Sequence, residues 1–244
     1  MRNSIDRCDP IGAGCVGWLN GQDFIGRIGY RGMTSTDALD TLLAGYVAGG
    51  LPEPARVLVA SHLEISERNR PFVRQLEAMA GAELESIEPI PIRHRDERLA
   101  RIFALTADEP PRAPPSRHDP RLPDALARFL GRDLPDLRWR TLLPGVRECR
   151  LGETDGCEAT LYWIRGGKPI PAHTHEGLEL TLVLDGAFSD GEGRYGRGEI
   201  AIADDEVDHR PIAEPGTDCL CFAVTDAPLR LTGPIGRFFA PFMR

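Results

Sequence analysis

The chain has 244 residues, of which 41% are hydrophobic and 27% charged, and a formal net charge of −8 at pH 7. This acidic balance argues against direct binding to nucleic acids or to anionic membranes, because both ligands need a basic face. No apolar run reaches the roughly 18–20 residues that span a membrane, and the N-terminus lacks a continuous apolar signal core, so we expect a cytoplasmic protein of one large or two small domains.

The N-terminal third is predicted to be helical after an irregular start. Residues 1–32 are rich in glycine and aperiodic, and we interpret them as a poorly ordered extension or a mis-assigned start upstream of Met33. From Ser35 or Thr36 onward, apolar residues recur at spacings of three and four, which predicts three short amphipathic helices, the third over 69–84. Helices of this size cannot bury a generous core alone, so we expect them to complete it against a partner.

A fourth helical pattern covers residues 93–105, which completes a predicted helical domain at 33–106. The segment 107–124 contains six prolines and is typical of a semi-stiff linker between domains. A short helix is predicted over 124–130. The second domain then covers 125–244.

From about Leu137 the apolar period changes to two, and the strand-like runs are separated by turns rich in glycine and proline. This pattern fits a small antiparallel jelly-roll barrel, although alternation alone would allow other barrels. The predicted fold class is therefore α+β, multidomain, with a small helical bundle followed by an all-β barrel. Within the barrel, Cys219 and Cys221 are expected to share one strand face as a buried apolar pair.

One stretch of the barrel has metal-binding chemistry. His173 and His175 are two residues apart on a predicted strand and therefore point to the same face, and Glu179 follows four residues later. Neutral imidazole nitrogens and a carboxylate oxygen suit zinc, iron, nickel or manganese. We expect Glu176 and Asp190 nearby to be solvated loop carboxylates, and no residue is assigned a catalytic role.

This stretch resembles the first cupin motif, in which a glycine, a His-x-His pair, a glutamate and a second glycine recur at fixed spacing. The matching positions are Gly167, His173, His175, Glu179 and Gly186. The second cupin motif matches in part, with Gly198 at its start and His209 as its histidine. The resemblance implies one divalent metal bound by His173, His175, Glu179 and His209 inside the barrel. We expect Phe188, Trp163 and Phe222 to shield it from water.

Both halves also resemble the ChrR-type zinc-binding anti-sigma factors, over roughly Thr36 to the C-terminus. The helical half shares Leu-Leu-Ala-Gly-Tyr-Val-Ala-Gly-Gly-Leu (42–51) and Val-Ala-Ser-His-Leu (59–63), and the barrel shares 173–190 and Asp-His-Arg-Pro (208–211). The resemblance implies a transcription regulator that binds an extracytoplasmic-function sigma factor through its helical domain and senses oxidative stress through its cupin domain. The segment 93–105 is then either the helix that clamps the sigma factor or a solvated connection.

The resemblance also implies a zinc site in the helical domain, made by a histidine and a His-x-x-x-Cys-x-x-Cys run. This chain retains His62, whereas the other three positions hold Asp37, Ser66 and Asn69. Neutral serine and asparagine cannot replace thiolates as tight zinc ligands. We therefore expect no zinc in the helical domain, and we expect His62 to be a partly buried residue that hydrogen-bonds a loop.

A rival function class is an enzyme. Three histidines and a glutamate in a cupin barrel also serve metal-dependent dioxygenases and related enzymes, in which open coordination positions bind substrate and oxygen. Zinc with four protein ligands would form a closed sensory or structural site, whereas iron, nickel or manganese would leave two of six positions open. A third possibility is a binding module for a small acid or sugar. We favour the regulator, with zinc as the metal.

Overall fold

The computed structural model describes residues 34–104 and 119–232. The predictions for residues 1–32, for Met33 as a start and for most of the proline-rich linker lie outside this range. The helices are α1 (Ser35–Val47), α2 (Glu53–Ile65), α3 (Arg70–Glu85), α4 (Arg95–Ala104) and α5 (Asp124–Leu130), followed by a 3-10 turn at Leu134–Asp136. Among these helices, none is long and apolar enough to cross a membrane.

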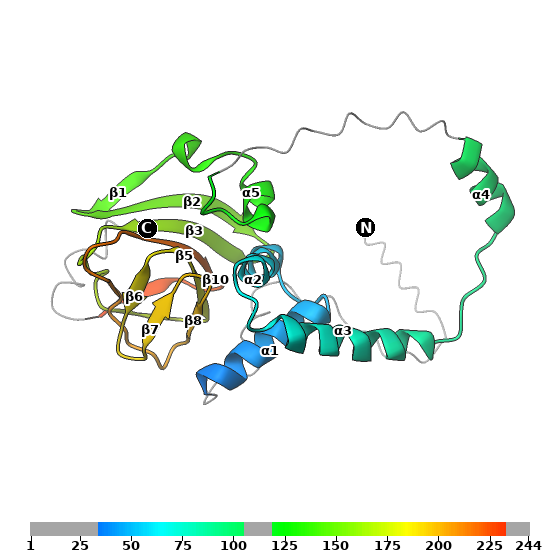
Figure 1. Cartoon of the computed structure of the whole chain (residues 1–244), viewed down its shortest axis with the longest axis horizontal. Coiled ribbons are helices and arrows are strands. Elements are labelled where there is room, and N and C mark those ends of the chain that lie inside the picture. The colour runs from blue at the N-terminus through cyan, green and yellow to red at the C-terminus, as the bar shows by residue number, and fades with distance from the viewer. Residues whose placement is uncertain (1–33, 105–118, 233–244) are drawn as a thin grey trace, which may run out of the picture.

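The predicted helices form close to their predicted bounds. The capping residue of α1 is Thr34, one or two residues earlier than predicted, and its side-chain oxygen accepts from the backbone N–H of Asp37 at 3.3 Å. Proline in the first turn of α2 and of α3 suits positions whose N–H groups have no helical partner. The fourth helix, α4, contains no buried residue, and Figure 1 shows that it lies apart from the barrel and the other helices.

The second half is a β-barrel of short antiparallel strands. They are β1 (Arg140–Leu143), β2 (Val146–Thr154), β3 (Cys157–Ile164), β4 (His173–His175), β5 (Glu179–Asp185), β6 (Ala187–Ser189), β7 (Arg194–Gly196), β8 (Ile200–Ala203), β9 (Ile212–Ala213), β10 (Cys219–Thr225) and β11 (Leu229–Leu231). The largest sheet has the order β1-β2-β3-β10-β5-β8, and two smaller sheets, β7-β6-β9 and β11-β4, complete the barrel. The change from helices to an all-β unit confirms the predicted fold class.

The central strands of the six-stranded sheet are buried on both faces. In β5, Leu180, Leu182 and Leu184 join the core that includes the helices, whereas the intervening Val183 joins the core of the barrel interior. The same parity puts Phe222 of β10 on the helix side and its neighbour Cys221 inside the barrel. Cys219 and Cys221 are both buried, with their Sγ atoms 3.4 Å apart, as expected of a pair on one strand face.

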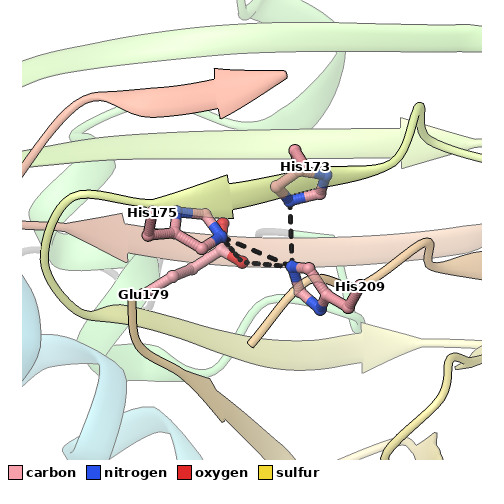
Figure 2. A group of neighbouring side chains, drawn as sticks. All are labelled: His173, His175, Glu179 and His209. Carbon is pink, nitrogen blue, oxygen red and sulfur yellow. Dashed lines mark hydrogen bonds and ion pairs between the residues drawn. The ribbon is translucent and has the colours of Figure 1, made fainter. Parts of the chain in front are cut away.

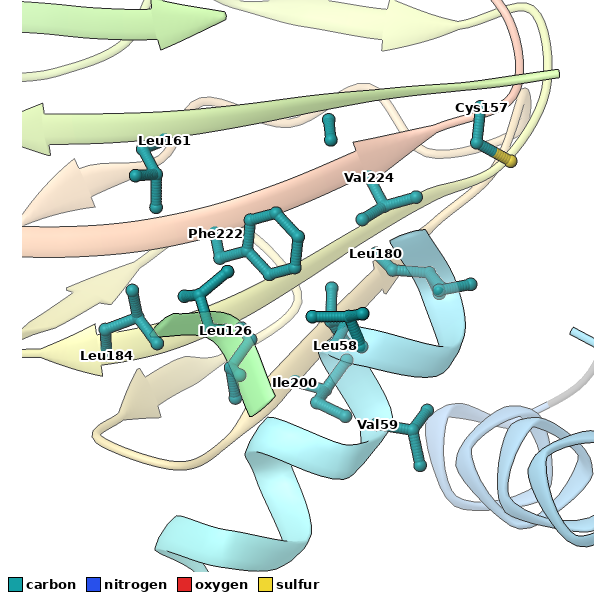
Figure 3. Packing of buried hydrophobic residues seen from close by; sticks show 14 of the residues in the cluster. Leu58, Val59, Leu126, Cys157, Leu161, Leu180, Leu184, Ile200, Phe222 and Val224 are labelled. Carbon is teal, nitrogen blue, oxygen red and sulfur yellow. The ribbon is translucent and has the colours of Figure 1, made fainter. Parts of the chain in front are cut away.

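The helices complete their core against the barrel of the same chain, and not against a separate partner as predicted. Leu58 of α2 is 0% exposed and lies among Phe222, Leu180 and Ile200 of the sheet (Figure 3). The short helix α5 packs beside α2 and contributes Leu126 to the same cluster. An amphipathic helix gains most of its stability from such tertiary packing, so α1, α2 and the barrel form one continuous core.

Candidate metal centre

Three segments of the barrel bring the four predicted ligands together. β4 supplies His173 and His175, β5 begins with Glu179, and His209 lies on the segment before β9. The backbones of His173 and His209 exchange two hydrogen bonds, with N···O distances of 3.1 and 3.0 Å, which aligns their side chains. Figure 2 shows the three imidazoles and the carboxylate converging on one point. All four side chains are buried.

The distances within this cluster match those between ligands of one metal ion. The Nε2 atom of His209 lies 2.9 Å from Nε2 of His173 and 3.4 Å from Nε2 of His175. Oε2 of Glu179 lies 3.3 Å from Nε2 of His175 and 3.6 Å from Nε2 of His209. Bonds of about 2.0–2.1 Å in a tetrahedron separate neighbouring ligand atoms by roughly 3.3–3.4 Å. The four residues can therefore hold one metal ion.

The hydrogen bonds on the outer side of the imidazoles provide an independent test of this fit. The Nδ1 atom of His173 lies 2.8 Å from the Pro171 carbonyl, and Nδ1 of His209 lies 3.1 Å from the Asp190 carboxylate. Both partners only accept hydrogen bonds, so both Nδ1 atoms donate and both Nε2 atoms carry lone pairs. Two lone pairs 2.9 Å apart repel each other unless a cation lies between them. The donor set therefore suits a bound cation.

A shared proton is a poor substitute for that cation. Burial lowers the pKa of His173 to about 4, and the neighbouring imidazoles act in the same direction against the opposing effect of Glu179. Burial alone would raise the pKa of Glu179, but its hydrogen bond with His175 and the electrostatic effect of the three imidazoles together outweigh burial and lower that pKa. Near neutral pH the cluster thus offers neutral imidazole at His173 and a carboxylate at Glu179, which are the forms that bind metals.

An apolar cavity of about 100 Å³ adjoins the cluster. Its floor is formed by His173, Glu179 and His209, and its walls are mainly aliphatic and aromatic side chains from β1, β3, β6 and β11. The lining includes Leu142, Leu143, Tyr162, Ile164, Ile170, Phe188, Leu229 and Leu231. A small apolar molecule in this cavity would lie directly beside the metal-binding atoms.

Two of the three aromatic residues predicted to shield the metal are elsewhere. Phe188 lines the cavity, as predicted. Trp163 instead packs edge-on against Trp139 and donates its indole N–H to Asp218, and Phe222 packs against Phe129 on the helix side. The physical reason is strand parity: Tyr162 of β3 and Cys221 of β10 point into the barrel, so their neighbours along the chain point outward.

Asp190 is a residue of the site that sequence reasoning missed. It was predicted to be a solvated loop carboxylate, but its side chain is only 2% exposed and lies behind His209. The signal available in the sequence was weak, because Asp190 is separated from His209 by 19 positions and precedes an ordinary Gly-Glu-Gly turn. Glu176 is exposed as predicted and pairs with Arg230.

In the helical half, the four positions at which the resemblance implies zinc ligands have surroundings that differ from those of the barrel cluster. His62 is buried, and its Nδ1–H donates to the carbonyl of Gly198 at 2.6 Å, which confirms the prediction of a buried residue bonded to a loop. Burial lowers the pKa of His62, opposed by the Gly198 carbonyl and by the side chain of Asn69. Asp37 is exposed and bonded to Thr34, and Ser66 follows the end of α2. His62 is the only histidine among these four residues, and its Nδ1 is engaged with the barrel backbone.

Gly198 is one of the positions where the two halves are in close contact. Its backbone has a φ of +83°, and an added Cβ would lie 2.9 Å from Cγ2 of Ile65. A side chain there would push α2 away from the barrel, so the close approach requires glycine. The strand that follows, β8, pairs with β5 so that Ala203 lies opposite Glu179. The contact of His62 is therefore made just before the start of the strand that pairs with the strand carrying Glu179.

Comparison with known proteins covers both halves. A family model described as the ChrR Cupin-like domain matches residues 130–228. The anti-sigma-E factor ChrR of Cereibacter sphaeroides is 44% identical over 206 residues, which make up 84% of this chain and 96% of that protein. A chain in the crystal structure of Rhodobacter sphaeroides SigE in complex with the anti-sigma ChrR is 43% identical, with a TM-score of 0.65 over 77% of this chain and 96% of that chain.

Proposed function

Because the chain belongs to the ChrR family of anti-sigma factors, we propose that its helical half binds an extracytoplasmic-function sigma factor. The relative in the solved complex is bound to SigE, and the match covers nearly all of that relative. We assign this binding to the domain at 33–106, joined by the linker at 107–124 to a cupin domain at 125–244. Since sigma factors act on RNA polymerase, the protein would work in the cytoplasm.

Exposed apolar side chains support a protein partner for this half. From the second half of α3 through α4, large hydrophobic residues face solvent: Met79, Leu84, Ile87, Ile90, Ile92, Ile102 and Phe103. Runs of exposed apolar surface mark interaction sites. α4 itself has apolar and charged residues at helical spacing but buries none of them within the described part of the chain. A sigma factor would cover this surface, with α4 as the helix that clamps it.

In the barrel, His173, His175, Glu179 and His209 would hold one divalent metal ion, zinc by preference. The observation that supports a bound cation is that the lone pairs on Nε2 of His173 and Nε2 of His209 face each other at 2.9 Å. Bound there, a metal would fix three separate barrel segments relative to one another. Oxidative stress that alters the ligands or the metal would change the barrel, and α2 packs directly on it. We expect this change to weaken binding of the sigma factor.

Metal analysis and complex formation test the two parts of this function separately. Elemental mass spectrometry of the full-length protein should give about one zinc per chain, and a variant with alanine at all four ligand positions should lose it; full retention would refute the site. Two zinc ions per chain would instead show that the helical domain also binds zinc. Co-expression with the sigma factor encoded beside it should give a one-to-one complex, and its absence would refute the regulator.

The apolar cavity beside the cluster favours a second candidate, a metal-dependent dioxygenase or related enzyme. A space of about 100 Å³ suits a small apolar substrate at an open coordination position. Iron, nickel or manganese in the purified protein, together with oxygen consumption on addition of small apolar compounds, would support the enzyme. Zinc without oxygen consumption would support the sensor.

A further inference from the structure

The turn between β6 and β7 reaches the candidate metal centre through one buried carboxylate. Oδ1 of Asp190 accepts hydrogen bonds from the backbone N–H groups of Glu192 and Gly193, at 3.0 and 3.1 Å. Oδ2 accepts from Nδ1 of His209 at 3.1 Å. The two oxygens therefore have separate partners: one closes the turn, and the other holds an imidazole whose opposite nitrogen faces the cluster.

The three imidazoles of the cluster differ on their outer sides. His209 donates to a carboxylate and His173 donates to the carbonyl of Pro171, whereas the buried Nδ1 of His175 has no hydrogen-bond partner among the described residues. A hydrogen bond to a charged acceptor is about twice as strong as one to a neutral acceptor. It also raises the basicity of the opposite nitrogen and fixes the orientation of the ring. His209 thus has the strongest outer support of the three.

We propose that Asp190 is a positioning residue of the metal centre, which holds His209 in the tautomer that presents a lone pair at Nε2. This role rests on the proposed metal site. An isolated neutral imidazole can carry its proton on either nitrogen, and only the form protonated at Nδ1 can bind metal through Nε2 here. The turn that holds Asp190 is thereby tied to the ligand that comes from the segment before β9.

The variant Asp190→Asn isolates this role. Oδ1 is retained, so the bonds from Glu192 and Gly193 can persist, while an NH₂ group replaces Oδ2 opposite Nδ1 of His209. This group donates and cannot accept, so it favours the tautomer with the proton on Nε2. That tautomer cannot bind a metal through Nε2. Loss of such an outer partner commonly lowers metal affinity by about 10–100-fold.

The experiment compares zinc affinity by competition with a chromophoric chelator, and the visible spectrum of the Co²⁺ form, in full-length protein. We expect Asp190→Asn to weaken zinc binding by about 10–100-fold and to alter the Co²⁺ spectrum. The matched control Glu192→Gln removes an exposed carboxylate from the same turn and should keep the wild-type affinity and spectrum. Asp190→Glu keeps a carboxylate and should recover part of the affinity.

Wild-type affinity and an unchanged Co²⁺ spectrum in Asp190→Asn would overturn the proposal. So would an equal loss in Glu192→Gln, because the effect would then come from charge alone. If Asp190→Asn is destabilised but its folded form binds zinc normally, Asp190 serves the hairpin and not the metal. Failure of the metal site itself looks different: the wild-type protein would then bind neither zinc nor Co²⁺.

Discussion

The helical half and the barrel each contain a histidine at a position where the family resemblance implies a metal ligand, but the two histidines have different surroundings. In the barrel, Nε2 of His209 points at two other imidazoles and a carboxylate. In the helical half, Nδ1 of His62 is bonded to a carbonyl of the barrel, and serine and asparagine occupy the thiolate positions. The barrel retains all four candidate ligands in one cluster, whereas the single histidine of the helical half serves the packing between the two halves.

The largest effect should come from the core that joins the halves. Leu58→Ala would leave a cavity where α2 packs on Phe222 and Leu180, and such truncations cost about 2–5 kcal/mol. Because the core is continuous, we expect one cooperative unfolding transition that shifts as a whole in denaturant. Met79→Ala, on the exposed part of α3, should leave the midpoint nearly unchanged. Two separate transitions in the wild-type protein would show that the halves unfold independently.

The next effect is a loss of stability in acid when the metal has been removed. Burial lowers the pKa of His173 to about 4, below the value near 6.5 of an unfolded chain. The unfolded state therefore binds more protons than the folded state between these two pH values. The contribution of His173 to the free energy of unfolding is fully present above about pH 6.5, and it falls toward pH 4 by about 1.4 kcal/mol per pH unit.

Denaturant unfolding of chelator-treated protein at pH 7 and pH 5 measures this loss. The pKa of His62 is lowered by burial as well, so it contributes with the same sign from the helical half. Replacing it in His62→Gln should make the pH dependence shallower, and the remainder then belongs to the barrel. Equal stability at both pH values would contradict the neutral state of both histidines.

The sequence predicted the convergence of the candidate ligands well because the spacing of three of them is local. His173, His175 and Glu179 lie within seven residues, and strand geometry alone places the two histidines on one face. The parity of β3 and β10 was out of reach, because both of their faces are buried and their apolar runs do not show which face is inside. The role of Asp190 depends on a hairpin and a distant segment folding together, which no local pattern records.

The helices show the same limit. Their periodicity predicted where each begins and ends to within a few residues, since capping and apolar spacing act along the chain. It could not predict that α2 packs on the barrel, because an apolar stripe on a helix specifies burial but not the surface that buries it. Gly198 shows this directly: besides its positive φ, glycine is needed there because a Cβ would contact Ile65, which lies far away in the sequence.

A smaller loss of stability should follow from substituting His62, and comparison with a His209 variant tests whether the two histidines have different roles. His62→Leu would leave the carbonyl of Gly198 buried without a donor, at a cost of about 1–2 kcal/mol. The matched variant His62→Gln keeps a donor and should lose less. Neither should change the zinc content, whereas alanine at His209 should lower it. A zinc loss in His62→Leu equal to that in His209→Ala would show that the two regions share a metal-dependent role.

The smallest effect on stability, and the largest on partner binding, is expected in α4. Phe103 is 82% exposed and its neighbour Ile102 is also exposed, in contrast to the fully buried Leu58 of α2. Serine at both positions removes no buried contact of the described chain, so the free energy of unfolding should stay within about 0.5 kcal/mol.

Truncation of apolar anchors in an interface typically costs more than about 1 kcal/mol of binding energy each, so the double variant should bind the sigma factor measurably less tightly. Arg98→Ala, an exposed change in the same helix, serves as the control for loss of helix surface alone. Binding by calorimetry or pull-down gives the answer. An unchanged complex would make α4 a solvated connection, and the apolar side chains of α3 and residues 86–92 would then have to contact the partner without it.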